Sequence, residues 1–162
     1  GNFYKYIQNV TNDTELFEII ISNFPNFKDE RMYKGKTVYL YKLAQLLTSD
    51  ILHIIEMKEN KKVDYSHLLG CADYKIPQVM RGLGLIEYSE ELSNIVDSKQ
   101  LIQESSEYEV EIRANMLVVI DMIKAKLDNK VCAIDINDYI WGQSKNKDIQ
   151  LKPYHLTRTT SY

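Results

Sequence analysis

Apolar side chains recur at helical spacing over two long stretches of the chain, and this pattern restricts the possible folds more than any other feature. From about Val38, one helical face carries Leu40, Leu43, Ala44, Leu47, Ile51, Ile54 and Ile55. A second face follows the capping-box pair Ser106 and Glu109 and carries Val110, Ala114, Leu117, Val118 and Ile123. No internal repeat and no alternation of strands with helices accompanies them. The sequence therefore predicts a mainly α, multi-helical domain.

Shorter elements are predicted around these two helices. A helix is expected over about 12–24, another from Ser89, and a last short one from Asp135. The segment 37–39 is the only candidate strand, and the closing PYHLTRTTSY is predicted to be irregular. We therefore expect a fold with little or no sheet.

Length and composition suit a single globular domain over residues 1–162. The chain has 162 residues, of which 44% are hydrophobic, so it can bury a substantial core. Its formal net charge of -3 argues against a protein that grips a long nucleic acid, because such proteins carry a basic excess. No apolar run reaches the roughly 18 residues of a membrane span, and no signal segment is recognised. Cys71 and Cys132 lack CxxC spacing, so we expect free thiols in a cytoplasmic protein without membrane contact.

Familiar catalytic and cofactor signatures are absent from the sequence. It contains no phosphate-binding glycine loop, no HExxH and no GxSxG. The three histidines are dispersed, and His53 is expected to be a structural residue on an apolar helix face. The pattern therefore predicts no metal or cofactor site.

Asp73 lies in the segment CADYKIPQ, just before a proline-containing turn. The residues around it are nearly uncharged, and a carboxylate in apolar surroundings is expensive to desolvate unless it is paired or used. Two interpretations stay open at this point. Asp73 can cap a helix that runs through Val79, or it can be a catalytic carboxylate.

Lys42 lies near the start of the first apolar helix, between Tyr41 and Leu43, where its side chain risks facing the core. Its amine can reach water by snorkelling. Alternatively, it is a buried cation near an anionic ligand or near Asp73.

The closing segment concentrates hydrogen-bond donors, namely His155, Thr157, Arg158 and Thr160. Such a set can bind a phosphate, for which arginine supplies a planar fork. The alternative is a frayed, polar terminus. Trp141 and the 12 tyrosines can stack on a flat base, but most of these aromatics are expected to be packing residues.

Several sequence blocks together resemble one enzyme family. The blocks are FKDERMYKGKTV, YKLAQLL, CADYKIPQVMRGLGLIEYS, EYEVEIRANM and PYHLTRTTSY. In this order and spacing they are similar to the queuosine salvage proteins, which release the base queuine from queuosine 5′-phosphate. The resemblance runs from about Phe27 to Tyr162 and corresponds to the C-terminal half of a usual family member.

The resemblance implies a fold, an activity and a set of site residues. Family members are mainly helical, with a fold likened to that of helix-hairpin-helix DNA glycosylases, and they hydrolyse an N-glycosidic bond without a metal or other cofactor. Asp73 matches the catalytic aspartate of the family, and Lys42 matches a lysine of the active site. The residues that we expect to bind the small nucleotide substrate are Asn137, Asp138, Trp141, Tyr74, His155, Thr157, Arg158 and Arg113. Among these, Arg158 with His155 is the expected phosphate contact.

The chain also departs from the family pattern. Asn137 replaces an aspartate four residues before the tryptophan, Cys71 replaces an aromatic residue, and Leu43 and Lys75 replace two arginines. The N-terminal half of the family is missing, so a pocket lined from both halves is incomplete here and a second polypeptide can supply the rest.

Two hypotheses of different classes follow. In the first, the chain is an N-glycosidase with Asp73 as its catalytic carboxylate. In the second, it is a catalytically incomplete binding or partner subunit of the same family. A DNA glycosylase is disfavoured, because the net charge is negative and no basic stripe is present.

Overall fold

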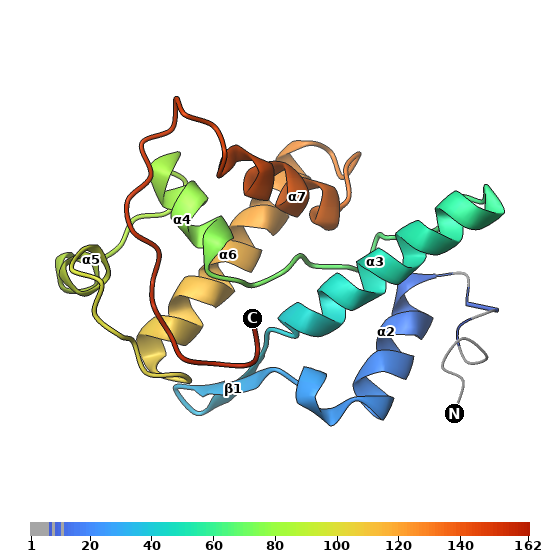
Figure 1. Ribbon diagram of the computed structural model, residues 1–162, viewed down its shortest axis with the longest axis horizontal. Coiled ribbons are helices and arrows are strands. Elements are labelled where there is room, and N and C mark those ends of the chain that lie inside the picture. The colour runs from blue at the N-terminus through green and yellow to red at the C-terminus, as the bar shows by residue number, and fades with distance from the viewer. Residues whose placement is uncertain (1–6, 8, 11) are drawn as a thin grey trace.

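The computed structural model describes residues 7, 9, 10 and 12–162, and within them the fold is mainly helical (Figure 1). The elements are α2 (Asp13–Asn23), the short 3₁₀ helix η1 (Pro25–Phe27), β1 (Glu30–Tyr33), β2 (Lys36–Tyr39), α3 (Lys42–Glu59), α4 (Lys75–Gly82), α5 (Glu90–Asp97), α6 (Glu107–Lys126) and α7 (Ala133–Gln143). The predicted mainly α class is confirmed. No helix in the described part of the chain is long and apolar enough to cross a membrane.

Side-chain caps begin three of the helices where the sequence predicts them. The side chain of Asn12 accepts from the backbone N–H of Glu15 at the start of α2, and Ser89 accepts from Leu92 at the start of α5. Ser106 accepts from the N–H of Glu109 at the start of α6. Each cap satisfies one of the backbone donors that the first turn of a helix leaves without a partner.

Other predicted boundaries need correction. The helix expected from about Val38 begins at Lys42, because residues 36–39 pair with residues 30–33 in an antiparallel hairpin. The candidate strand at 37–39 is thereby confirmed. The last helix begins at Ala133 rather than Asp135, and His53 is exposed, with its ring 5.0 Å from that of Tyr65.

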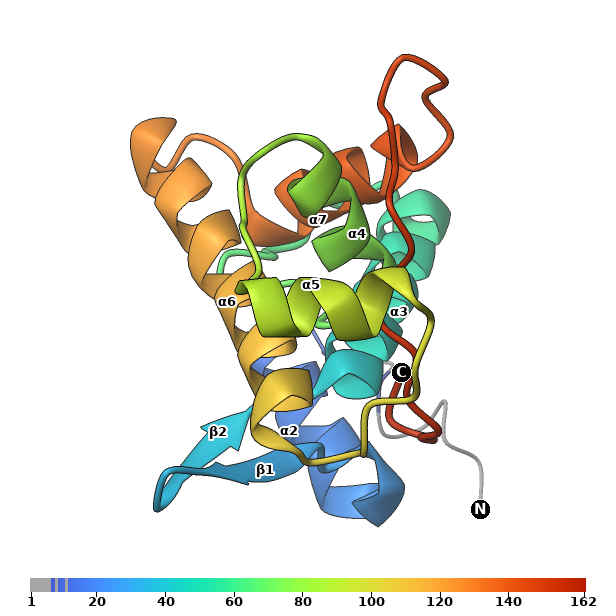
Figure 2. The ribbon, with the colours of Figure 1, turned by 90° about the vertical axis from the view of Figure 1, so that its left-hand side faces the viewer.

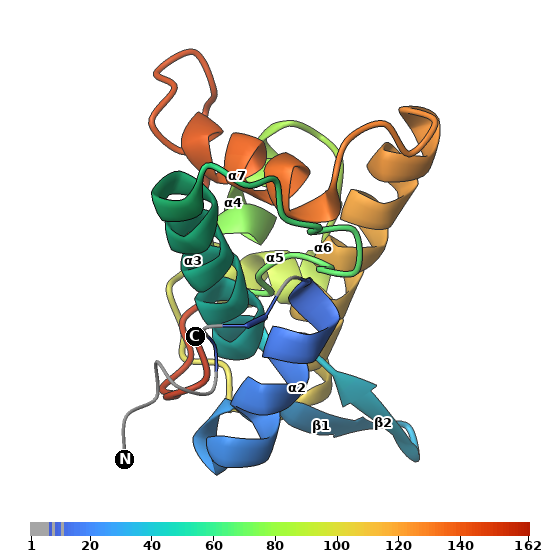
Figure 3. The same ribbon diagram turned by 90° about the vertical axis from the view of Figure 1, so that its right-hand side faces the viewer.

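The two largest apolar clusters among the described residues hold most of the helices together. One lies between α2 and α3 and contains Leu16, Ile20, Ala44 and Leu52. The larger one lies among α4, α6 and α7 and contains Ile76, Val79, Met80, Met116, Ile120 and Ile140. Figure 3 shows α2 beside α3, with α4 and α7 above α2, between α3 and α6. Apolar burial in these clusters is the main stabilising contribution to the fold.

The segment 60–74 connects the two clusters and carries Asp73 at its end. The fully buried carboxylate of Asp13 accepts from the N–H groups of His67 and Leu68, which anchors the segment to α2. Gly70 has φ +107°, and a Cβ atom there would lie 3.1 Å from Ile120 Cδ1 of α6. Only glycine fits this backbone conformation and this close approach.

The tail that follows α7 contains no helix or strand, as predicted. It passes α4 and α5 and ends beside the start of α3 (Figures 1 and 2). The N–H of Ile102 donates to the carbonyl of Leu156, and the Ser161 hydroxyl accepts from Arg31 Nη2 at 2.7 Å. The terminus is therefore packed against the domain rather than frayed.

Loss of the α6 cap is expected to weaken the domain measurably. Ser106→Ala should lower the free energy of unfolding by about 1 kcal/mol, because the Glu109 N–H loses its acceptor. Urea unfolding checks this value. The matched control is Ser22→Ala at an exposed position of α2, where the hydroxyl has no hydrogen-bond partner among the described residues. Equal midpoints for the two variants would contradict the assignment.

Candidate functional site

Asp73 is buried immediately before α4, with 8% of its surface exposed. Its Oδ1 atom accepts from the backbone N–H groups of Lys75 and Ile76, each at 2.9 Å. The capping interpretation is therefore correct for this oxygen. The other oxygen, Oδ2, makes no hydrogen bond to any described residue. One carboxylate thus caps the helix and still offers a second oxygen to a ligand.

Burial governs the protonation of this carboxyl group. It raises the pKa of Asp73 above its ordinary value, because the charged form is poorly solvated. The Ile76 N–H, the Lys42 charge and the Lys75 N–H each offset part of this increase. A buried carboxylate with a raised pKa and a nearby cation is characteristic of a site that handles protons.

Lys42 is half-buried at the first position of α3 and acts on the same region. Its charge lowers the pKa of the Asp73 carboxyl and opposes the burial that raises the pKa of the Cys71 thiol to about 12. The negative charges of Asp73 and Asp138 raise the pKa of that thiol further. Lys42, Asp73 and Asp138 therefore converge on one region from α3, the 60–74 segment and α7. Lys42 and Asp73 form no direct ion pair in the described structure.

Asn137 holds the Asp73 segment against α7. Its Oδ1 accepts from the Cys71 N–H at 2.8 Å, and its Nδ2 donates to Asp138 Oδ1 at 2.9 Å. An amide makes both bonds, whereas an aspartate here would place a second carboxylate beside Asp138. The Asn137 side chain is only 4% exposed, so its polar groups are already committed within the protein.

Asp138 and Trp141 lie on the exposed side of α7, one helical turn apart. Trp141 is 44% exposed, and the Lys145 Nζ atom lies 4.9 Å from the centre of its ring. The indole is therefore accessible for stacking.

An aromatic pair lies directly beside Asp73. The rings of Tyr74 and Tyr154 are 4.7 Å apart, and both residues are more than one-third exposed. Lys75 Nζ lies 4.9 Å from the Tyr154 ring centre and donates to Gln78. Nothing in the sequence distinguishes Tyr154 from the other tyrosines; only the path of the tail across α4 places its ring against Tyr74.

Arg113 is fully buried in α6, and its guanidinium group donates only to protein oxygens. Nε donates to the carbonyl of Ala72 at 2.7 Å, Nη1 to Glu109 at 2.9 Å, and Nη2 to Asp29. The Tyr162 ring covers the guanidinium, with its centre 4.1 Å from Cζ. This geometry favours a role in positioning the site rather than direct contact with a substrate. Sequence analysis missed the partner Asp29, which no local pattern distinguishes.

The structure separates the predicted phosphate donors of the tail. His155 is buried, with Nε2 at 3.1 Å from the Tyr162 hydroxyl, whereas Arg158 is exposed beside residues 101–104. Positions three apart in an extended chain face opposite sides, which explains the separation. His155 Nδ1 and Thr157 Oγ1 are buried without a partner among the described residues. The predicted pairing of His155 with Arg158 is therefore not observed.

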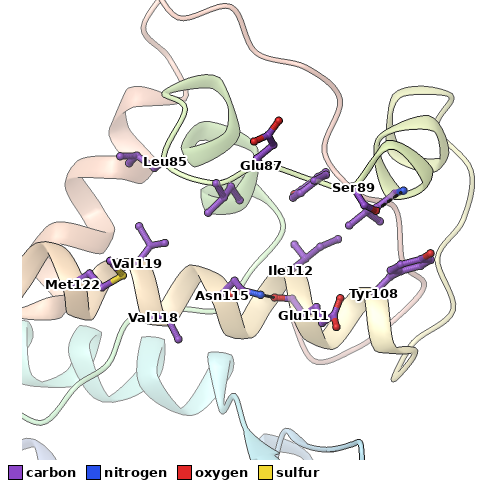
Figure 4. A pocket seen from close by; sticks show the side chains of 13 residues that line it. Leu85, Glu87, Ser89, Tyr108, Glu111, Ile112, Asn115, Val118, Val119 and Met122 are labelled. Carbon is purple, nitrogen blue, oxygen red and sulfur yellow. Dashed lines mark hydrogen bonds between the residues drawn. The ribbon is translucent and has the colours of Figure 1, made fainter.

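A separate cavity of about 370 Å³ lies between α6 and residues 85–89 (Figure 4). Glu87 and Glu111 are its charged lining residues, and none of the predicted site residues borders it. Two carboxylates disfavour a phosphorylated ligand, so we place the candidate site at Asp73 instead. The described residues contain no cluster of three or more potential metal ligands.

Burial of His155 predicts a specific dependence of stability on pH. Desolvation, and secondarily the Arg113 charge, lowers the pKa of His155 to about 4 from 6.5. The unfolded chain then binds a proton as the pH falls through 6.5, whereas the folded chain does not until about pH 4. The stability provided by neutral His155 is therefore present above pH 6.5 and is lost as the pH falls toward 4.

His155→Gln should remove this dependence. Between pH 6.5 and 4, we expect the wild type to lose on the order of 3 kcal/mol more unfolding free energy than His155→Gln. Urea unfolding at several pH values measures the two slopes, whatever the absolute stability of the variant. Parallel slopes would show that His155 is not held neutral by the fold.

Comparison of the chain with known proteins identifies its family. The family model described as "Queuosine salvage protein" matches residues 1–162. A protein of Dictyostelium discoideum is 32% identical, covering 100% of this chain and 52% of its own length. A protein of Sphaerobacter thermophilus is 32% identical, and the match covers 91% of this chain and 47% of that protein. A protein of Mus musculus is 29% identical, and the match covers 100% of this chain and 52% of that protein.

Each of these three proteins is named queuosine 5′-phosphate N-glycosylase/hydrolase. The chain spans about half the length of these curated relatives. A match over the whole chain, together with the recognisable blocks around Asp73, Arg113 and the tail, leads to one conclusion: the chain belongs to the queuosine salvage protein family.

Proposed function

We propose that the chain carries the catalytic carboxylate for hydrolysis of the N-glycosidic bond of queuosine 5′-phosphate, which releases queuine. The observation that carries this proposal is the environment of Asp73. Its carboxyl is buried, is held by two backbone N–H groups, and keeps one oxygen without a partner among the described residues. The printed names of the relatives support the same reaction and a small nucleotide as substrate.

The chemistry requires a carboxylate of this kind. Cleavage of a ribosyl bond develops positive charge at C1′, as in other glycoside hydrolysis. A fixed carboxylate stabilises that charge and orients or deprotonates the attacking water. The leaving base is a 7-deazapurine and lacks N7, so protonation at that atom cannot assist its departure. More of the catalysis then depends on Asp73.

We assign Lys42 to the charge balance of the site. Its cation favours the ionised form of Asp73, which burial alone would disfavour. It also adds positive charge close to a nucleotide phosphate. Loss of Lys42 should therefore raise the pKa of the Asp73 carboxyl.

The remaining predicted contacts divide into two groups. Tyr74, Trp141 and Asp138 are exposed and are proposed to bind the base by stacking and hydrogen bonding. Arg158 and Thr157 remain candidates for the phosphate. Arg113, Asn137 and His155 are proposed to shape the site from the interior, because their polar groups are buried.

We also propose that residues 1–162 form one domain with a helical arrangement like that of helix-hairpin-helix DNA glycosylases. The contacts of α4 with both α6 and α7, which seat Asp73 at a helix start, support this proposal. It concerns the fold alone, since the negative net charge disfavours DNA as a substrate.

Asp73→Asn tests the catalytic assignment. The variant keeps an oxygen for the α4 cap but loses the charge, so we expect kcat to fall by about 10²- to 10⁴-fold. Release of free queuine from queuosine 5′-phosphate is measured by chromatography. Asp135→Asn, at an exposed position of α7, is the matched control and should retain wild-type turnover. Equal turnover by Asp73→Asn and wild type would refute the assignment.

A second candidate follows from the length of the relatives. Because the chain spans about half of them, the pocket can require residues that this chain lacks. The chain would then bind the nucleotide without hydrolysing it, until a second polypeptide completes the site. Calorimetry with queuosine 5′-phosphate, combined with the turnover assay, separates the two candidates. Turnover by the isolated chain would exclude the second one.

A further inference from the structure

Asp29 connects two parts of the structure that both lead to the candidate site. Its backbone carbonyl accepts from the N–H groups of Leu40, at 2.9 Å, and Tyr41, at 3.3 Å. These are the two residues immediately before Lys42. Tyr41 itself has φ +46°, a left-handed conformation that is unfavourable for this residue type and persists only where the surroundings enforce it. Asp29 therefore holds the two residues that precede α3 and Lys42.

The side chain of Asp29 makes the second connection. Its carboxylate accepts from Arg113, with Nη1 at 3.4 Å and a shorter bond from Nη2. On its other edge the same guanidinium donates from Nε to the carbonyl of Ala72 at 2.7 Å. Ala72 is the residue immediately before Asp73. The contacts thus run from the backbone just before Lys42, through Asp29 and Arg113, to the backbone just before Asp73.

Every member of this connection is held rigidly. Asp29, Ala72 and Arg113 are between 0% and 3% exposed. The guanidinium is planar and presents its donors in a fixed geometry, so it cannot shift at one acceptor without shifting at the other. A buried ion pair of this kind adds little stability compared with apolar residues of the same volume, so a specific geometry is the better explanation for it.

We propose that the buried Asp29–Arg113 pair is a bridge that sets the position of Lys42 relative to Asp73. Both members are positioning residues for the reaction under "Proposed function", and the catalytic consequence rests on that proposal. The claim about geometry does not rest on it, because that claim concerns only the relative position of Lys42 and Asp73 in the protein without substrate. The bridge therefore has a test of its own.

Several charged groups among the described residues surround the bridge and the site. Lys42 of α3 and Lys75 of α4 act on the Asp73 carboxyl. Asp138 of α7, Asp50 of α3 and Asp73 itself act on the neighbouring thiol of Cys71. Two further charged groups contact the bridge: Arg31 lies 3.2 Å from Asp29, and Glu109 lies 2.9 Å from Arg113. Of these groups, Lys42 affects the Asp73 pKa from α3, whose start lies next to the residues that Asp29 holds.

The test measures the electrostatic coupling between Lys42 and Asp73 by NMR. The Asp73 carboxyl is titrated with ¹³C-labelled aspartate in the full 162-residue chain, with and without Lys42→Met. Lys42→Met should raise the Asp73 pKa, because it removes the neighbouring cation. In the backgrounds Asp29→Asn and Arg113→Lys this increase should shrink by roughly half or more, since the Coulomb energy falls with distance. Arg113→Lys keeps the charge but cannot reach both acceptors, so it serves even if Asp29→Asn fails to fold.

Glu109→Gln is the matched control. It removes another buried carboxylate from Arg113 but leaves both connections of the bridge intact. The Lys42 effect on the Asp73 pKa should persist in this background, even if stability falls. The proposal would be overturned if Lys42→Met raised the Asp73 pKa in folded Arg113→Lys as much as in the wild type. It would also be overturned if Glu109→Gln reduced this increase as much as Arg113→Lys does.

Turnover distinguishes this proposal from the proposed function. If the wild type releases queuine, Arg113→Lys should lower kcat with little change in KM, because the substrate contacts remain while the charge geometry is lost. A change confined to KM would contradict positioning. If the wild type releases no queuine, the proposed function fails while the NMR coupling still decides whether the bridge exists.

Discussion

The guanidinium group of Arg113 has no contact with solvent, and its nitrogens donate to oxygens from three separate segments. Removing a cation from water is expensive, and this expense is offset only when every donor finds an acceptor in good geometry. The acceptors are Asp29, just before the β1–β2 hairpin, Ala72, in the segment before α4, and Glu109, in α6 itself. Because all must be in place together, the relative positions of these segments are coupled. The tail joins them when Tyr162 covers the guanidinium.

Desolvation also explains the character of Asp73. The same apolar surroundings that stabilise α4, α6 and α7 raise the pKa of this carboxyl, and the backbone N–H groups at the start of α4 oppose that increase. In the proposed function, capping and catalysis are therefore two uses of one side chain. The first use orients the carboxylate, and the second depends on the oxygen that capping leaves over.

Local signals in the sequence were sufficient for much of the fold. The caps at Asn12, Ser89 and Ser106 act within four residues, so their effect is visible in the sequence alone. The start of α3 was not predictable in this way. Apolar periodicity continues through Val38 and Leu40, but pairing with β1 makes residues 36–39 a strand. A hydrogen-bonded partner strand overrides a weak local preference.

The sequence by itself determined that the chain is mainly helical, that it belongs to its family, and that Asp73 and Lys42 are the groups to examine. Each of these depends on residue types and spacings along the chain. Only the tertiary structure decided which side chains share a region with Asp73. Asp29 pairs with Arg113, and Tyr154 contacts Tyr74, whereas Arg158 does not lie beside His155. None of these relations could be predicted locally, because they depend on contacts between distant segments. Burial, which decides whether a charge is paired, strained or available, exists only once those segments are packed together.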